Sequence, residues 1–337
     1  MSISLKELSA RAGLSPTAVS LVMNNKHAGH VPEARAKEIR DLARKLGYRP
    51  NLNARSLRGC ARKLIGVLMP LPRDASATYF SILLQQKIGQ LGYMPLFSYW
   101  HGYSEVAACY RAALDHNVDG IIAWENPNLQ LAKNTPQVIY FSSEQQEYDA
   151  VNPDNLSMLK KTVKIFQQKE RKRICLISTA ESFYAKSEIS KLANKKSTAI
   201  KLLSFYPFRQ NFSELVESNF AGEEHPDAVF VHNDALAETL AQTLRDLGKR
   251  VPEDVMIIGC NNMLELPPTK PLPTFDIHHE EIVDKLIKLL FRRIAKPDAT
   301  IKKELVKPSY LEKINSTVYG PLPKKDFNHE TQGKFKD

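Results

Sequence analysis

The chain has 337 residues, enough for two or three domains, and its 43% hydrophobic and 25% charged residues exclude a disordered or a membrane-embedded chain. The net charge of +10 lies almost wholly in residues 1–63, which hold thirteen Lys or Arg against four Asp or Glu. The rest is nearly neutral, so only the head has the charge excess that contact with phosphates favours.

Three helices are predicted in this basic head. Apolar residues on one helical face mark the segments 5–12, 16–24 and 32–46. Ser4 and Glu7 form a capping box before the first helix, and a Ser-Pro pair suits the start of the second. The residues expected in the core of the head are Leu5, Leu8, Ala12, Val19, Val22, Met23, Ala36, Ile39, Leu42 and Ala43.

From residue 63 onward, short apolar runs alternate with amphipathic stretches. The strand candidates are 64–69, 95–99, 120–124, 137–141, 174–178, 200–205, 228–232 and 255–259. The helix candidates include 79–91, 105–114, 156–167, 235–247 and 280–294. Such alternation predicts an α/β body of parallel sheets with helices on both faces. Its length suits two lobes, with a ligand cleft at the carboxyl ends of the strands.

The domain organisation follows from these patterns. We expect an all-α DNA-binding domain at 1–49, a hinge or linker at 50–62 and the two-lobed body at 63–323. Residues 324–337 are polar and lack periodicity, which predicts a disordered tail.

The first two predicted helices form a helix-turn-helix pattern, because a short turn containing Gly13 joins them. In this motif the second helix enters the major groove. A buried helical hairpin gives a similar pattern. The terminal position, the local basicity and the third helix favour DNA binding over that alternative.

The same residues carry a family resemblance. The segment 5–20, LKELSARAGLSPTAVS, closely resembles the start of the lactose/galactose repressor family. The segments LGYRPN at 46–51 and ARSLR at 54–58 resemble the hinge of that family. Further similar segments lie at 119–122, 151–155, 231–234 and 251–259. The resemblance implies a helix-turn-helix head on a periplasmic-binding-protein-like body.

By this resemblance, Pro16, Thr17 and Leu21 face base edges in the major groove. Thr17 is the best candidate, since its hydroxyl can hydrogen-bond and its methyl can contact thymine. Leu21 stands where the family commonly has Arg, so the operator should differ there, although a core position for Leu21 fits the sequence equally well. Further phosphate or base contacts are expected from Lys6, Arg11, Ser15, Ser20, Asn24, Asn25 and Arg35.

The hinge segment 51–58 is too short for a stable isolated helix and is expected to order on DNA. In the family, two hinge helices pair in the minor groove and a Leu from each wedges between central base pairs. Leu57 holds that position here. The hinge contacts are expected from Asn51, Ala54, Arg55, Leu57 and Arg58. Pairing of two hinges implies a homodimer on a near-palindromic operator. The alternative is that segment 51–58 is only a linker between the head and the body.

The resemblance also implies a small effector in the cleft, and Asn233 and Asp234 suit sugar hydroxyls. Other pocket positions differ from the family pattern: Asn261 and Asn262 stand where two acidic residues are common, and Met158 replaces a frequent Gly. Phe141 stands near a position often occupied by Asp, and the usual ligand-clamping Arg is absent or shifted to about Lys186. These changes argue against an ordinary sugar and leave open another ligand or none. Tyr79 and Trp124 can stack on a ligand, or else pack inside a lobe.

Competing function classes lack their sequence signatures. No phosphate loop, nucleophile elbow, HExxH or metal-spaced His/Cys set is present, so we expect no catalytic residue, metal or cofactor. A periplasmic-type binding protein shares the body fold but needs a signal peptide, which the first residues do not resemble. We therefore expect a cytoplasmic repressor, at the nucleoid when bound to DNA, with four cysteines as reduced thiols.

Overall fold

The computed structural model describes residues 3–48, 62–124, 135–140, 147–178, 189, 192, 198–205, 210–265, 267, 270–317 and 320–321. Its contacts divide the chain into two compact units, Met1–Arg62 and Lys63–Asp337. The predicted hinge contacts at 51–58, the tail at 324–337, Phe141 and Lys186 lie outside the described residues.

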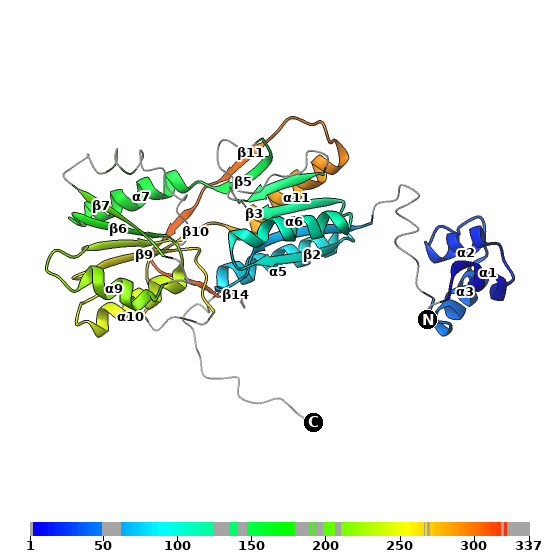
Figure 1. Ribbon diagram of the computed structural model, residues 1–337, viewed down its shortest axis with the longest axis horizontal. Coiled ribbons are helices and arrows are strands. Elements are labelled where there is room, and N and C mark those ends of the chain that lie inside the picture. The colour runs from blue at the N-terminus through cyan, green and yellow to red at the C-terminus, as the bar shows by residue number, and fades with distance from the viewer. Residues whose placement is uncertain are drawn as a thin grey trace, which may run out of the picture. The chain divides into compact units, whose positions relative to one another are not determined.

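The head unit contains the three predicted helices, α1 (Leu5–Ala12), α2 (Pro16–Met23) and α3 (Glu33–Lys45) (Figure 1). The Ser4 and Glu7 capping box is present, and Ser15 Oγ accepts a hydrogen bond from the Ala18 amide at the start of α2. Helix α1 ends at Gly13, whose φ of 66° is the left-handed conformation that glycine adopts without strain.

The core of the head is built from one face of each helix. Its buried members are Leu8, Ala12, Val19, Val22, Val31, Ala36, Ile39 and Ala43. Leu5, Met23 and Leu42, which the sequence also assigned to the core, are partly buried against this cluster. The helical periodicity therefore identified the inward face correctly.

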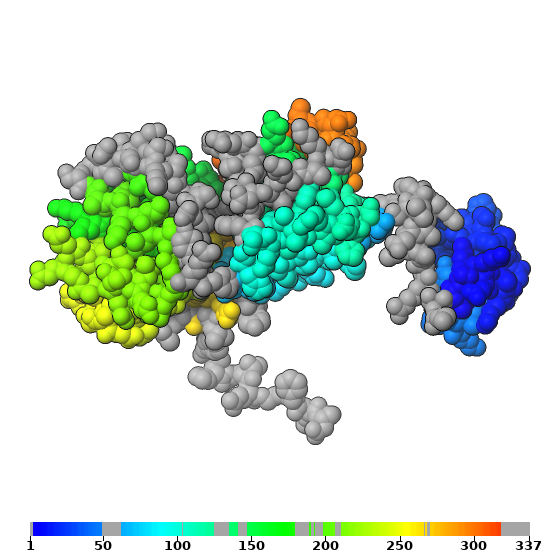
Figure 2. Space-filling model, in the orientation of Figure 1, coloured from blue at the N-terminus to red at the C-terminus, as the bar shows by residue number. Residues whose placement is uncertain are grey.

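The first lobe of the body is a parallel six-stranded sheet in the order β11-β5-β4-β3-β1-β2. Its strands are β1 (Leu64–Pro70), β2 (Met94–Trp100), β3 (Gly120–Trp124), β4 (Gln137–Tyr140), β5 (Asp149–Pro153) and β11 (Lys303–Val306). Its helices are α5 (Ala75–Gln90), α6 (Val106–Asp115), which follows the short η1 (Tyr103–Glu105), and α11 (His279–Ala295). In Figure 2, α5 and α6 form much of the visible surface of this lobe.

The second lobe has the strand order β12-β10-β9-β8-β6-β7, parallel except for the antiparallel pair of β10 and β12. Its strands are β6 (Arg173–Ser178), β7 (Ala199–Ser204), β8 (Ala228–Val231), β9 (Met256–Cys260), β10 (Thr274–Asp276) and β12 (Ser309–Leu311). Its helices are α7 (Asn155–Gln168), α9 (Phe212–Phe220) and α10 (Asp234–Asp246), and a small ribbon pairs β13 (Ser316–Thr317) with β14 (Gly320–Pro321).

Both faces of each sheet are covered. In the first lobe Ile65 and Val67 of β1 pack in the cluster that contains α5 and α11, whereas Leu68 packs in the cluster that contains α6. Neighbouring strand residues point to opposite faces, so strands covered on both sides must be apolar throughout. This explains why the sequence shows continuous apolar runs and confirms the predicted doubly covered parallel sheets.

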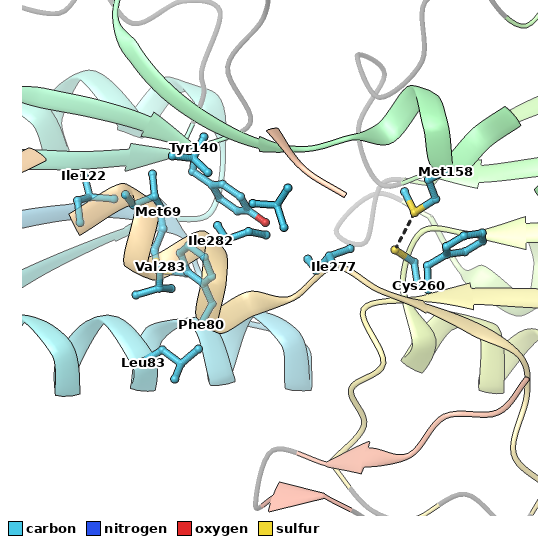
Figure 3. Packing of buried hydrophobic residues seen from close by; sticks show 14 of the residues in the cluster. Met69, Phe80, Leu83, Ile122, Tyr140, Met158, Cys260, Ile277, Ile282 and Val283 are labelled. Atoms are coloured by element: carbon cyan, nitrogen blue, oxygen red, sulfur yellow. Dashed lines mark hydrogen bonds between the residues drawn. The ribbon is translucent and has the colours of Figure 1, made fainter. Parts of the chain in front are cut away.

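Within the described part of the chain, crossings between the lobes follow β5, β10 and β11. One buried cluster extends across this junction. Figure 3 shows Phe80 and Tyr140 of the first lobe and Met158 and Cys260 of the second, with Ile277 between the two groups. None of the helices among the described residues is long and apolar enough to cross a membrane.

Candidate nucleic-acid interface and interlobe pocket

Helix α2 presents two different faces. Val19 and Val22 are completely buried, whereas Pro16 and Thr17 are exposed. The Thr17 hydroxyl and methyl are therefore free to contact a molecule outside the head. This is the placement that base reading requires of a recognition helix.

Leu21 lies on the outer side of α2. It is half-buried, but it belongs neither to the buried core of the head nor to the apolar residues packed against that core. Of the two placements that the sequence left open, the structure thus favours the outer face over the core.

Some of the polar residues around α2 form hydrogen bonds within the head. The Asn24 side-chain amide donates to the Ser20 carbonyl oxygen at 2.7 Å, so it fastens the last turn of α2. Asn25 follows with a φ of 54°, a left-handed conformation that Asn tolerates better than most residues. Lys6, Arg11 and Asn25 are exposed, and Ser20 is half-buried.

Arg35 has a structural contact that the sequence did not reveal. Its guanidinium donates to the Ala12 carbonyl oxygen at 2.7 Å and forms an ion pair with Glu38. The Ala12 carbonyl lies at the end of α1, where backbone acceptors lack helical partners. Arg35 therefore ties α3 to α1, and only the remaining part of its guanidinium is available to a phosphate.

A second contact fixes the loop before α3. Glu33 accepts a hydrogen bond from His27 Nε2 at 2.8 Å and from Arg40 at 2.9 Å, and His27 is buried. These bonds, that of His27 first, lower the pKa of Glu33 to about 2. Sequence reasoning missed this cluster because its members stand in a polar loop and on α3 without a local motif.

The body contains a cavity of about 740 Å³ between the lobes. It brings together two of the predicted effector residues, Tyr79 of α5 and Asn261 after β9. The other lining residues are Asn262, Met263, Asp276, His278, His279, Glu280, Glu281, Asp284, Lys285, Lys288 and Ser316. Trp124, Asn233 and Asp234 do not line it.

Asp234 is buried under its own hydrogen bonds. One carboxylate oxygen accepts from the Thr274 hydroxyl at 2.7 Å and the other from the Met263 amide at 2.9 Å. Burial raises the pKa of Asp234 well above its ordinary value. Gly259 is required beside it, since a Cβ there would collide with the carboxylate. This placement favours a structural role in joining α10, β10 and the loop after β9.

Asn233 connects the two lobes. Its side-chain oxygen accepts from the Leu236 amide at 3.0 Å and caps α10, while its nitrogen donates to Asp74 Oδ2 at 2.7 Å. Asp74 in turn caps α5 of the first lobe through the Ala77 amide. The Asn233 amide thus holds two helix starts, one from each lobe, against each other.

The aromatic candidates differ in their surroundings. Trp124 packs edge-on against Phe80 and Tyr140, with ring centroids 5.4 and 4.5 Å away, as expected for a lobe-core residue. Tyr79 is half-buried and its hydroxyl donates to Glu280 at 3.1 Å on the rim of the cavity. Tyr79 is therefore the better placed of the two to contact a ligand.

Comparisons with known proteins agree with this geometry. Residues 185–313 match the model of a periplasmic binding protein-like domain. The ribose operon repressor of Lactococcus lactis is 25% identical over 77% of this chain and 81% of its own length. The ribose operon repressor of Bacillus subtilis is 27% identical over 82% of this chain and 88% of its own. The solved Lac repressor bound to ONPG superposes with a TM-score of 0.75 at 19% identity, over 93% of this chain and 99% of that one.

The chain is thus similar to repressors of the lactose/galactose family. The family resemblance seen in the head segment 5–20 thus extends over most of the chain, in sequence and in fold. The curated relatives compared above are named as repressors and not as enzymes.

The departure from the family at Asn262 has a physical reason. Asn262 donates from its amide nitrogen to Asp276 at 3.1 Å and to the Asn315 side-chain oxygen at 2.8 Å, and it accepts from the Asn315 amide at 2.9 Å. An ionised carboxylate at 262 has no proton to donate and would repel Asp276. The neutral amide is therefore the group that fits beside this acidic neighbour.

Met158, where the family often has Gly, fills the interlobe core. It is buried, and its sulfur lies 3.7 Å from the Cys260 sulfur (Figure 3). Cys109, Cys175 and Cys260 are free thiols among the described residues, and no group of three or more acidic, His or Cys side chains in that part of the chain is arranged to hold a metal.

Proposed function

We propose that this chain is a sequence-specific transcriptional regulator that acts as a homodimeric repressor on a near-palindromic operator. The observation that carries the proposal is the outward face of α2, with Thr17 exposed, on a head that holds thirteen basic against four acidic residues within 1–63. A solved Lac repressor dimer bound to operator is among the structures that share this fold, with a TM-score of 0.75 at 18% identity.

Recognition in this proposal combines two grooves. Thr17 reads a base edge in the major groove, and Leu21 offers an apolar contact where an Arg would discriminate guanine by about 1–3 kcal/mol. Leu57 wedges into the minor groove at the centre of the site, flanked by Asn51, Ala54, Arg55 and Arg58. Lys6, Arg11 and the free part of Arg35 contact phosphates and set the register.

The homodimer has a candidate surface on the first lobe. Ile82 and Leu91, in or next to α5, and Met94 and Tyr99 of β2 are exposed large apolar residues on adjacent elements (Figure 1). Strand β2 is also an edge of its sheet. Exposed apolar residues along an edge suit coverage by a second copy of the chain.

The cavity between the lobes is the proposed effector site. Its lining combines Tyr79, amide groups and several carboxylates, so it suits a small molecule rich in hydroxyl or amino donors rather than an anion. A ligand there contacts both lobes and favours one lobe arrangement, which changes operator affinity through the hinge. The proposed domains are 1–49 for DNA, 50–62 for the hinge and 63–323 for effector and dimer, in a cytoplasmic protein without catalysis.

A ligand-independent regulator is the second candidate. It is favoured by the direct hydrogen bond from Asn233 to Asp74, which already holds the lobes together through protein groups alone. The two candidates differ in whether any small molecule changes operator affinity.

Selection of genomic binding sites with the purified protein tests the proposal. We expect enrichment of a palindromic site of roughly 14–20 base pairs, with half-sites about one helical turn apart. Repeating the selection with candidate ligands separates the two candidates. Enrichment of no palindrome contradicts DNA-specific regulation.

A further inference from the structure

A second cavity, of about 520 Å³, lies in the second lobe beside α7 and is distinct from the interlobe pocket. Among the residues that the structure describes, the two cavities share no lining residue. One side of the second cavity is the α7 face with Lys161 and Lys164, which are spaced three apart and so lie on the same face of the helix. The opposite side is Phe275 of β10 and the segment with Lys307 and Pro308.

The charge of this cavity is one-sided. Lys160, Lys161, Lys164 and Lys307 line it, and no Asp or Glu is among its described lining residues. All four lysines are exposed, and within the described part of the chain none of them forms an ion pair. Four exposed lysines without a lining carboxylate give this cavity a positive potential, which attracts an anion.

The floor of the cavity is apolar. Met158 and Phe275 are buried, and Pro308 lies beside them. Phe275 packs against Tyr310 with ring centroids 5.5 Å apart, and the Lys161 ammonium lies 5.4 Å from the Tyr310 ring centroid. The cation–π contact keeps the exposed Lys161 ammonium beside Tyr310, which packs on Phe275.

The cavity also lies beside the junction where the chain crosses between the two lobes. Lys307 and Pro308 belong to the crossing from β11 to β12, Phe275 precedes the crossing from β10 to α11, and Ser157 follows the crossing from β5 to α7. A molecule in the cavity therefore contacts the β11–β12 crossing at Lys307 and lies close to the other two crossings.

From these observations we propose that the α7 cavity is a binding site for a phosphorylated small molecule with an apolar or aromatic part. The phosphate accepts hydrogen bonds from the lysine ammonium groups, and the apolar part lies against the half-buried Ile165 and the methylene groups of the lysines. The site is separate from the interlobe effector pocket and does not depend on DNA binding.

Calorimetry with the full chain and 1-naphthyl phosphate tests this site. We expect saturable binding of one molecule per chain, tighter than that of inorganic phosphate, which lacks the ring, and of 1-naphthol, which lacks the charge. The variants Lys161→Gln/Lys164→Gln and Lys160→Gln/Lys307→Gln should each weaken binding by about tenfold, because each removes two charged donors.

The matched control is Lys296→Gln/Lys302→Gln, which removes the same charge from exposed lysines of the first lobe that do not line the cavity. It should leave the affinity unchanged. Equal weakening in the control and the cavity variants would mean general attraction to a basic protein and overturn the proposal. Absence of saturable binding, or binding lost in Asn261→Leu but retained in the cavity variants, would overturn it as well.

Discussion

The surroundings of single residues in the head distinguish residues that are free to contact DNA from residues that stabilise the fold. Thr17 is exposed on α2 and has no structural duty in the core, whereas Arg35 and Glu33 are engaged in contacts that hold the helices and the preceding loop together. Substitutions at these positions should consequently affect different measurements.

Thr17→Ala should reduce affinity for the selected operator and leave affinity for unrelated DNA unchanged. Loss of one base contact costs about 1–3 kcal/mol of discrimination, that is roughly tenfold or more. Titration of labelled duplexes measures both affinities. The control Lys37→Ala removes an exposed charge of α3 and should weaken the two duplexes equally, if at all. An equal loss in Thr17→Ala would mean that Thr17 does not read sequence.

Glu33 should make the stability of the head depend on pH. Its pKa falls from 4.5 to about 2 on folding, so its stabilising effect is complete above about pH 4.5 and is lost as the pH falls toward 2. Hydrogen-exchange protection of the α3 amides, corrected for intrinsic rates, should decrease over this window. Glu33→Gln should lower the amide protection at pH 7 and flatten its dependence on pH. Glu38→Gln should keep the pH dependence of the unmodified protein. A full pH dependence in Glu33→Gln would exclude Glu33 as its source.

At the scale of elements, the two edge strands of the first lobe differ in what surrounds them. Strand β2 borders α5, and together these elements provide the exposed residues Ile82, Met94 and Tyr99, whereas β11 at the opposite edge exposes Leu305. If a second copy of the chain covers the β2 edge, a charged residue introduced at that edge should weaken the dimer, whereas one introduced at the β11 edge should not.

Met94→Lys should therefore shift the protein from dimer to monomer, because a charge at the covered edge must be desolvated without a partner. Sedimentation velocity measures the change. Leu305→Lys is the matched control, since it places the same charge on an exposed residue of the other edge strand and should leave the dimer intact. A dimer that survives Met94→Lys and dissociates in Leu305→Lys would place the interface at β11.

At the scale of the whole molecule, the proposed mode of binding places two heads and two hinges on one operator. Only a dimer can place two hinge segments together in the minor groove, so in this proposal the hinge strengthens operator binding and not non-specific binding. Non-specific binding depends chiefly on phosphate contacts.

Leu57→Ala should accordingly weaken operator binding far more than non-specific binding, and it should reduce the bend of the operator. Titrations and the electrophoretic mobility of circularly permuted fragments measure these effects. Leu52→Ala, in the same segment but outside the wedge position, provides the comparison. Equal losses on both kinds of DNA would show that Leu57 is not a wedge.

The sequence alone identified the three head helices and the doubly covered sheets, because helix and strand periodicity and caps are local properties of the chain. Its motifs also showed the resemblance to the lactose/galactose repressor family. It missed β5, β10, β11, β12 and the two-residue β13 and β14. These strands are interrupted by polar residues or are very short, so they lack the apolar runs that marked β3, β8 and β9. It also placed the start of α5 at Tyr79, whereas the Asp74 cap begins the helix at Ala75.

Only the tertiary structure decided which polar residues face a ligand. Asn233 and Asp234 follow a strand end, where a cleft is expected, yet neighbouring elements use their side chains for structural hydrogen bonds. Conversely, Lys307 and the lysines of α7 are far apart in sequence. They line one cavity only because β11, β12 and α7 meet at the junction between the lobes. Local chemistry determines the elements, whereas burial and long-range contact determine which side chains remain free to bind.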